Sequence, residues 1–257
     1  MREATFRFYA ELNDFLPPAR RQRDWRHAFW GHPAVKDTIE ALGVPHTEVD
    51  LILVNGRSVG FEHPLQGGDR VSVFPIFESL DIASLVRLRP KPLREPRFVL
   101  DAHLGRLAAY LRMLGFDSLY RNDFEDEALV RISCQDQRIL LTKDRGLLKR
   151  SILSHGYYVR AIEPRRQIVE VLRRFDLFSL SAPLSRCKHC NGLLEVVDKQ
   201  EIVDRLPPGT RRSFDEFRRC EDCRHIYWKG AHYQRMVAFI EEILAMEACT
   251  DDLRNSQ

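Results

Sequence analysis

Four of the six cysteines form two C-x-x-C pairs, Cys187 with Cys190 and Cys220 with Cys223, and 29 residues separate the pairs. The chain begins MREATFRFYAEL, without the apolar core of a signal peptide, so we expect a cytoplasmic protein whose cysteines bind metal. Four thiolates close a tetrahedral shell around Zn²⁺, which is typical of a structural site. A redox dithiol is the alternative, but two matched pairs favour a zinc ribbon.

Three aspartates follow apolar runs that read as strands. Asp101 ends RFVLDA, Asp123 ends DSLYRND, and Asp144 ends RILLTKD. Ligands of an open parallel sheet bind beyond the carboxyl ends of its strands, so these carboxylates should converge, with Asp126 and Glu127 on the same side. Such a cluster repels itself unless a cation is bound, and oxygen ligands suit Mg²⁺ or Mn²⁺. The alternative is that each aspartate only forms a turn or caps a helix.

A basic segment accompanies these acids. Residues 145–174 contain 8 Lys or Arg and 2 Glu, although the whole chain has a net charge of only +3. A divalent metal beside a basic surface indicates phosphodiester hydrolysis, because the metal activates water and the cations hold phosphates. The candidate phosphate-binding residues are Arg106, Lys143, Arg145 and Lys149. A solvated helix surface is the alternative, and Lys143 could simply offset the charge of Asp144.

Strand and helix patterns alternate through this part of the chain. The predicted strands 97–102, 117–123, 138–144 and 157–162 are each followed by a helical pattern, in 104–115, 125–136, 145–156 and 164–178. Four such units predict a parallel sheet covered by helices on both faces.

The N-terminal part has a different pattern. Strands in 4–12, 48–56 and 68–77 surround one helix in 34–43, which predicts a small α+β roll. The stretches LILVNGRSV and LQGGDRVSVFP resemble the ubiquitin-like sulfur-carrier family, whose members act through a C-terminal Gly-Gly. Here the corresponding place reads FPIFESLD and the chain continues. We therefore expect a binding or scaffolding module with a protein partner; a sulfur-transfer accessory role is the weaker alternative.

A second resemblance rests on three stretches: FVLDAHLGRLAAYLRMLGFDSLYRND, ILLTKDRGLL and FRRCEDCRHIYWKGAHYQRM. Together they resemble the PIN-like ribonuclease domain named for the C-terminus of the Mut-seven exonuclease. The resemblance implies a bacterial source, a PIN-like α/β fold, a zinc ribbon and a metal site at Asp101, Asp123 and Asp144, with Asp126 or Glu127 in support. It implies RNA hydrolysis, and non-catalytic RNA binding through the PIN-like domain and zinc ribbon is the alternative.

The predicted organisation is three domains and a linker. A ubiquitin-like domain (1–80) precedes a proline-containing linker (81–96), a PIN-like nuclease domain (97–182), and a zinc ribbon with a final helix (183–248). Apolar residues make up 44% of the 257, enough for several cores, and charged residues make up 30%. No apolar run reaches about 18 residues, so we expect no membrane span.

One motif near the second cysteine pair combines aromatic and basic residues. HIYWKGAHYQRM contains Tyr227, Trp228 and Tyr233 among Lys229 and Arg235. Such a mixture can stack bases and hold phosphates. The alternative is a hydrophobic seam that packs the ribbon onto the nuclease domain.

Overall fold

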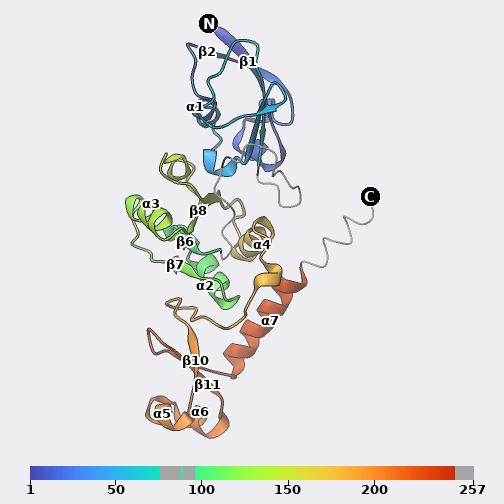
Figure 1. Cartoon of the computed structure of the whole chain (residues 1–257). Helices are drawn as coiled ribbons and strands as arrows, with labels where there is room; N and C mark the ends of the chain where they lie inside the picture. Colours follow the sequence, from blue (N-terminus) through green and yellow to red (C-terminus); the bar gives the residue numbers. More distant parts are fainter. Residues whose placement is uncertain (76–87, 89–95, 247–257) are drawn as a thin grey trace. The chain divides into compact units, whose positions relative to one another are not determined.

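The computed structural model describes residues 1–75, 88 and 96–246 (Figure 1). The chain divides into two compact units: Met1–Glu95 with Asp126–Tyr158, and Pro96–Glu125 with Val159–Gln257. Most of the predicted linker and residues 76–81 of the FPIFESLD segment lie outside the described residues. Across the described ranges, every helix is too short or too polar to cross a membrane.

The N-terminal part of the first unit is a five-stranded sheet in the order β2-β1-β5-β3-β4. Its strands are β1 (Arg2–Phe8), β2 (Trp25–Phe29), β3 (Leu51–Val54), β4 (Arg57–Ser58) and β5 (Arg70–Phe74). β1 pairs parallel with β5, and the other neighbours pair antiparallel. The helical segments are α1 (Val35–Ala41) and the 3₁₀ helices η1 (Ala10–Phe15), η2 (Pro18–Arg20) and η3 (His46–Glu48).

Alternation of side chains explains how this sheet forms a core. Ala4, Phe6 and Phe8 on β1 are buried and the residues between them are half-exposed, so only one face of the strand is covered. α1 contributes Val35 and Ile39, both fully buried, to the same hydrophobic cluster. The predicted α+β roll is confirmed.

The hairpin between β3 and β4 depends on its two turn residues. Val54 pairs with Arg57, so Asn55 and Gly56 alone form the loop, with φ of 52° and 80°. A two-residue loop of this kind needs positive φ at both positions, which Asn-Gly adopts readily. Asn55 and Gly56 therefore reverse the chain between β3 and β4.

The first unit also contains α3 (Asp126–Gln135), β8 (Ile139–Thr142), η5 (Leu147–Lys149) and β9 (Gly156–Tyr158). β8 and β9 are parallel, and all four residues of β8 are buried. The helix predicted in 145–156 is wrong, because only the short η5 forms there. Leu147, Leu148 and Leu153 are buried but Ile152 is 65% exposed, and this spacing makes no continuous helical stripe.

η3 joins the roll to the β8–β9 part of its unit. His46 Nε2 lies 2.9 Å from the backbone oxygen of Leu153, and the Tyr158 N–H donates to Glu48 Oε1 at 2.6 Å. Glu48 has no solvent exposure. A buried carboxylate with a backbone donor is a specific contact, because either group left alone would be strongly destabilising.

The second unit contains another parallel pair, β6 (Phe98–Leu100) and β7 (Ser118–Tyr120). Its helices are η4 (Ala102–Leu104), α2 (Gly105–Met113), α4 (Pro164–Arg174), η6 (Phe178–Leu180) and α7 (Ala231–Ala245). α2 buries Leu107, Ala108 and Leu111 at helical spacing. α7 lies beside α4, where Arg165 forms two hydrogen bonds with Glu242 (Figure 1). Parallel strands with flanking helices confirm the predicted α/β class.

The last part of this unit is a three-stranded antiparallel sheet, ordered β10-β11-β12. Its elements are β10 (Leu194–Val197), α5 (Lys199–Ile202), η7 (Val203–Arg205), α6 (Pro208–Ser213), β11 (Phe217–Cys220) and β12 (Ile226–Trp228). One face packs Val197, Phe217 and Ile226 against Ile202 and Leu206. A core of this size needs additional stabilisation, which a metal can supply.

Candidate functional site

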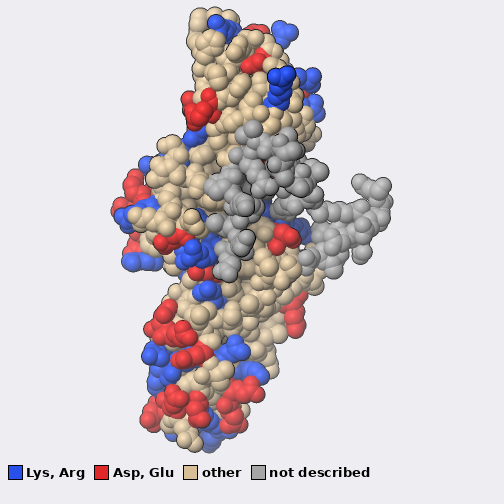
Figure 2. Space-filling view, in the orientation of Figure 1, with Lys and Arg blue, Asp and Glu red and all other residues tan. Residues whose placement is uncertain are grey.

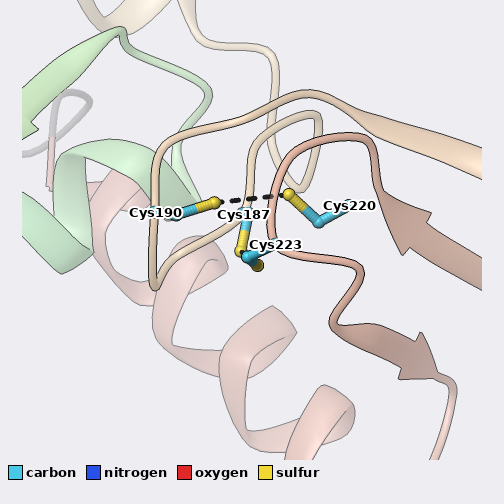
Figure 3. A group of neighbouring side chains, drawn as sticks. All are labelled: Cys187, Cys190, Cys220 and Cys223. Carbon is cyan, nitrogen blue, oxygen red and sulfur yellow. Dashed lines mark hydrogen bonds between the residues drawn. The ribbon is translucent and has the colours of Figure 1, made fainter.

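The four paired cysteines meet at one point, on two loops that face each other (Figure 3). Their Sγ atoms all lie within 4.8 Å of one another; Cys190 and Cys220 are 3.3 Å apart, and Cys187 and Cys223 are 3.7 Å apart. A tetrahedral Zn²⁺ with bonds of about 2.3 Å has sulfur–sulfur edges of about 3.8 Å. The donor set and its spacing therefore fit a four-thiolate metal ion.

The two loops have the same backbone geometry. The Cys187 N–H donates to the Gly192 oxygen at 2.8 Å, and the Asn191 N–H donates back to the Cys187 oxygen at 2.9 Å. The second loop repeats both bonds four and five residues after Cys220, at 3.1 and 2.9 Å. The residue directly after the second cysteine of each pair, Asn191 or Arg224, has a positive φ, of 80° and 60° respectively. Each C-x-x-C pair is thus a knuckle that directs two sulfurs to one side.

Close approach of the knuckles requires glycine at position 192. A Cβ added to Gly192 would lie 2.4 Å from Asp222 Oδ2 and 2.9 Å from Cys220 Sγ. Both distances are shorter than van der Waals contact. A larger residue would therefore have to displace the Asp222 side chain and would press on the Cys220 sulfur.

The four thiols differ in acidity. Burial raises the pKa of the Cys190, Cys220 and Cys223 thiols. Burial also opposes ionisation of Cys187, but hydrogen bonds, first among them the one with the Tyr227 hydroxyl at 3.1 Å, outweigh it and lower that pKa to about 7. A metal held by four thiolates displaces these protons, so binding weakens as pH falls.

A buried arginine from α2 supports the first knuckle. Arg112 is 4% exposed; its Nε donates to the Ser118 oxygen at 2.8 Å, and its guanidinium donates to the oxygens of Lys188 (3.3 Å) and His189 (2.8 Å). Burial lowers the Arg112 pKa, and the charges of Cys190 and Cys187 oppose that shift. The cation therefore favours thiolates next to it.

Asn191 forms a second support. Its Oδ1 accepts from the Ser118 N–H and its Nδ2 donates to Asp117 Oδ1, both at 2.8 Å. The sequence reasoning missed Asn191 and Arg112. Arg112 had a detectable signal, since a charged residue four positions after the buried Ala108 falls on the covered face of its helix.

The two knuckle histidines are not needed to complete the metal shell. His189 and His225 are exposed, and their rings stack tilted with centroids 4.6 Å apart. Burial of part of each ring lowers both imidazole pKa values.

Each predicted acidic residue lies within three residues after a strand or at the start of a helix. Asp101 directly follows β6, Asp123 lies three residues beyond β7, and Asp126 is the first residue of α3. Arg121 forms two hydrogen bonds with Asp123, at 2.9 and 2.7 Å, and these lower the pKa of that carboxyl. Glu127 pairs with a different cation, Arg150, at 3.2 Å. The convergence of these acidic residues on one metal site stays a prediction.

Asp144 occupies a turn after β8. Its Oδ1 accepts from the Gly146 N–H at 2.6 Å, and its own N–H donates to Thr142 Oγ1 at 2.9 Å. The side chain is exposed. One carboxylate oxygen therefore stabilises the turn, which is the structural role that the sequence left open beside metal binding.

Two of the predicted phosphate-binding cations contact the N-terminal part of their own unit. Arg145 lies over the rings of Phe15 and Tyr158, 5.0 and 5.2 Å from their centroids. Lys149 Nζ donates to the backbone oxygen of Glu40 at 2.6 Å. These contacts fix the segment that follows Asp144.

The other two cations have different surroundings. Arg106 is exposed on α2, and Lys143 is half-buried next to Asp144. Figure 2 shows Lys and Arg side chains interspersed with Asp and Glu over the face in view. RNA binding by these four residues stays a prediction.

Comparison with known families identifies the chain. A family model described as Mut7-C RNAse domain matches residues 96–240, and one described as Mut7-C ubiquitin matches residues 1–81. The first match covers 145 of 257 residues. The chain belongs to the Mut7-C RNAse domain family. Both resemblances noted in the sequence, a Mut7-C ribonuclease domain preceded by a ubiquitin-like domain, are confirmed.

Solved structures add little to this assignment of the Mut7-C chain. Two crystal structures of small archaeal modifier protein 1 from Haloferax volcanii match, with 20% and 18% identity. Each covers 30% of this chain, and 100% and 99% of the modifier, with a TM-score of 0.25. At this score the likeness carries no argument about function. No curated protein matches the chain.

Proposed function

We propose that this Mut7-C chain is a metal-dependent ribonuclease that hydrolyses RNA phosphodiester bonds. The observation that carries the proposal is the match of residues 96–240 to an RNAse domain. Asp101, Asp123 and Asp144, each following a strand, would hold Mg²⁺ or Mn²⁺, with Asp126 in support. When bound, such an ion lowers the pKa of a coordinated water and stabilises the leaving oxygen.

The cysteine site would have a structural role. Its four thiolates leave no open position for a substrate, so we assign it to Zn²⁺ rather than to the catalytic metal. The proposed organisation keeps a ubiquitin-like domain (1–80), a nuclease domain (97–182) and a zinc ribbon (183–248). Cytoplasmic location and a bacterial source stay predictions of the sequence.

RNA cleavage in the presence and absence of Mg²⁺ or Mn²⁺ tests the activity. Asp144→Asn should abolish cleavage, because it removes an anionic ligand while its amide oxygen can still accept from Gly146. Asp37→Asn is the matched control, since Asp37 is an exposed helix residue of the same unit. Equal cleavage by Asp144→Asn and wild type would refute the assigned site.

A second variant separates catalysis from folding. Asp144→Ala removes both the charge and the hydrogen bond to Gly146, so it should also destabilise the turn by about 0.5–2 kcal/mol. Asp144→Asn should keep the turn, and relief of repulsion among the carboxylates should raise its melting temperature when metal is absent. If both variants melt equally early and Mn²⁺ shifts no melt, Asp144 serves only the turn.

Non-catalytic RNA binding is the second candidate. Two observations favour it. Arg121 already forms an ion pair with Asp123, and one carboxylate oxygen of Asp144 already accepts a hydrogen bond from the Gly146 N–H within its turn. A binding module needs no divalent ion at the acids. RNA binding without cleavage, and without any Mn²⁺-dependent change in melting temperature, would establish this function instead.

The ubiquitin-like domain is proposed to bind a protein partner. Its sequence continues past the position where sulfur carriers end in Gly-Gly, so we expect no thiocarboxylate on it. Because η3 already contacts the β9 region, a partner would use another face. Mass spectrometry of the isolated protein that found a sulfur adduct on residues 1–80 would favour sulfur transfer.

A further inference from the structure

A pocket of about 390 Å³ opens on one face of the β10–β12 sheet. It lies within the range of roughly 300–1,000 Å³ that is usual for sites of small ligands. Its apolar lining includes Met113, Val196, Tyr227, Trp228, Tyr233 and Met236. These side chains come from the sheet, from α7 and from the end of α2, all within the second unit.

Strand register explains why this face is available. Val196 pairs with Arg218, and Arg218 pairs with Tyr227, so these three side chains form one row across the sheet. The opposite face packs on the ribbon's own core. Val196 is 81% exposed, so the structure leaves an apolar side chain uncovered beside a cation and an aromatic ring.

The charges around the pocket favour an anion. Four cations and two carboxylates line it: Arg186, Lys188, Arg218, Lys229, Asp215 and Glu216. Both carboxylates already pair with lysines, Asp215 with Lys199 at 2.7 Å and Glu216 with Lys229 at 2.5 Å. Arg218, by contrast, donates to the neutral backbone oxygen of Leu184 at 3.0 Å. Positive charge therefore exceeds negative charge beside the aromatic surface.

Tyr227 connects the pocket to the cysteine site. Its ring lines the pocket, and its hydroxyl lies 3.1 Å from Cys187 Sγ. A loaded metal site should therefore hold this wall of the pocket in place.

We propose that this pocket binds one unstacked nucleotide of single-stranded RNA, with the base against Tyr227 and Tyr233 and the phosphate near Arg218. Aromatic rings stack on any base, and cations beside them hold the backbone. The inference rests on the proposed function only in taking RNA as the ligand. It assigns RNA contacts to residues of the ribbon that are different from the four predicted cations Arg106, Lys143, Arg145 and Lys149.

Binding can be measured without cleavage. The probe is a fluorescein-labelled single-stranded RNA, titrated in fluorescence anisotropy with zinc-loaded full-length protein and no added Mg²⁺ or Mn²⁺. A gel confirms that the RNA stays intact. Arg218→Glu and Val196→Asp should each weaken binding by about tenfold or more, since both put a carboxylate where the phosphate or base would lie.

Matched controls distinguish the pocket from general electrostatics. Ile162→Asp adds the same charge at an apolar residue of the same unit that is 89% exposed, and Arg57→Glu reverses a charge on the β4 strand. Both should bind within about twofold of wild type. Tyr233→Ala should lose about fivefold or more, and Tyr233→Phe should retain stacking. Zinc content and melting temperature confirm that each variant is folded.

The outcomes separate this inference from the ribonuclease proposal. Wild-type affinity in Arg218→Glu and Val196→Asp, or equal losses in Ile162→Asp, would overturn the pocket whatever the cleavage assay shows. Selective losses with no cleavage by wild type would support the pocket and favour the RNA-binding alternative. Crosslinking of thiouridine-labelled RNA should also map to residues 214–236, and crosslinks confined to other segments would contradict the site.

Discussion

Replacing Arg112 by methionine should loosen the cysteine site without touching a cysteine. The variant loses two short hydrogen bonds, to the oxygens of Ser118 and His189, and a longer one to Lys188. Hydrogen bonds to charged groups contribute about 1.5–3 kcal/mol each, and the smaller desolvation cost of methionine offsets part of the loss. We expect the free energy of local unfolding of the second unit to fall by about 2–4 kcal/mol.

Hydrogen exchange of amides in the second unit measures that opening free energy, and transfer of zinc to a chromogenic chelator measures retention of the metal. Arg112→Met should release zinc faster than wild type, and Arg112→Lys should be intermediate because it keeps the charge but not the planar fork. Arg106→Met, exposed on the same helix, is the control. Exchange and zinc release unchanged in Arg112→Met would refute the supporting role.

Three further changes have expected outcomes. Glu48→Ala should destabilise the first unit by about 1–3 kcal/mol, because the Tyr158 N–H loses its acceptor, and Glu48→Gln should cost less in a urea titration; equal stability of both variants would contradict this. Arg121→Gln should raise the pKa of Asp123 toward its ordinary value, seen in carboxyl NMR shifts, and should tighten Mn²⁺ binding if Asp123 is a metal ligand. Gly192→Ala should lower zinc content, measured by elemental analysis, because its Cβ would overlap the second knuckle.

Short-range features of the fold followed from local sequence. The alternation in β1, the Asn55-Gly56 turn and the proline at the start of α4 each depend on neighbouring residues alone, so local sequence is enough to specify them. The helix expected in 145–156 failed for the opposite reason. Its leucines pack at positions that the rest of the unit determines, so apolar content there did not imply a helical stripe.

For the candidate sites, too, some features can be read from the sequence and others only from the folded chain. Two C-x-x-C pairs specify a metal site by their chemistry, since sulfur ligands and their spacing are written in the chain. The supports of that site, Arg112 and Asn191, are distant in sequence from most of their partners, so only the folded chain reveals them. The same holds for the pocket, which needs three strands in register beside α7.

The sequence by itself determined the family, the α/β class and the four cysteines able to bind a metal, because these depend on residue type, period and spacing. Only the tertiary structure decided which groups the charged side chains contact. Arg145 and Lys149, chosen as phosphate ligands for their charge, lie against Phe15, Tyr158 and the Glu40 carbonyl. A cation's partner is set by whatever group packing brings within reach, and no local pattern encodes that distance.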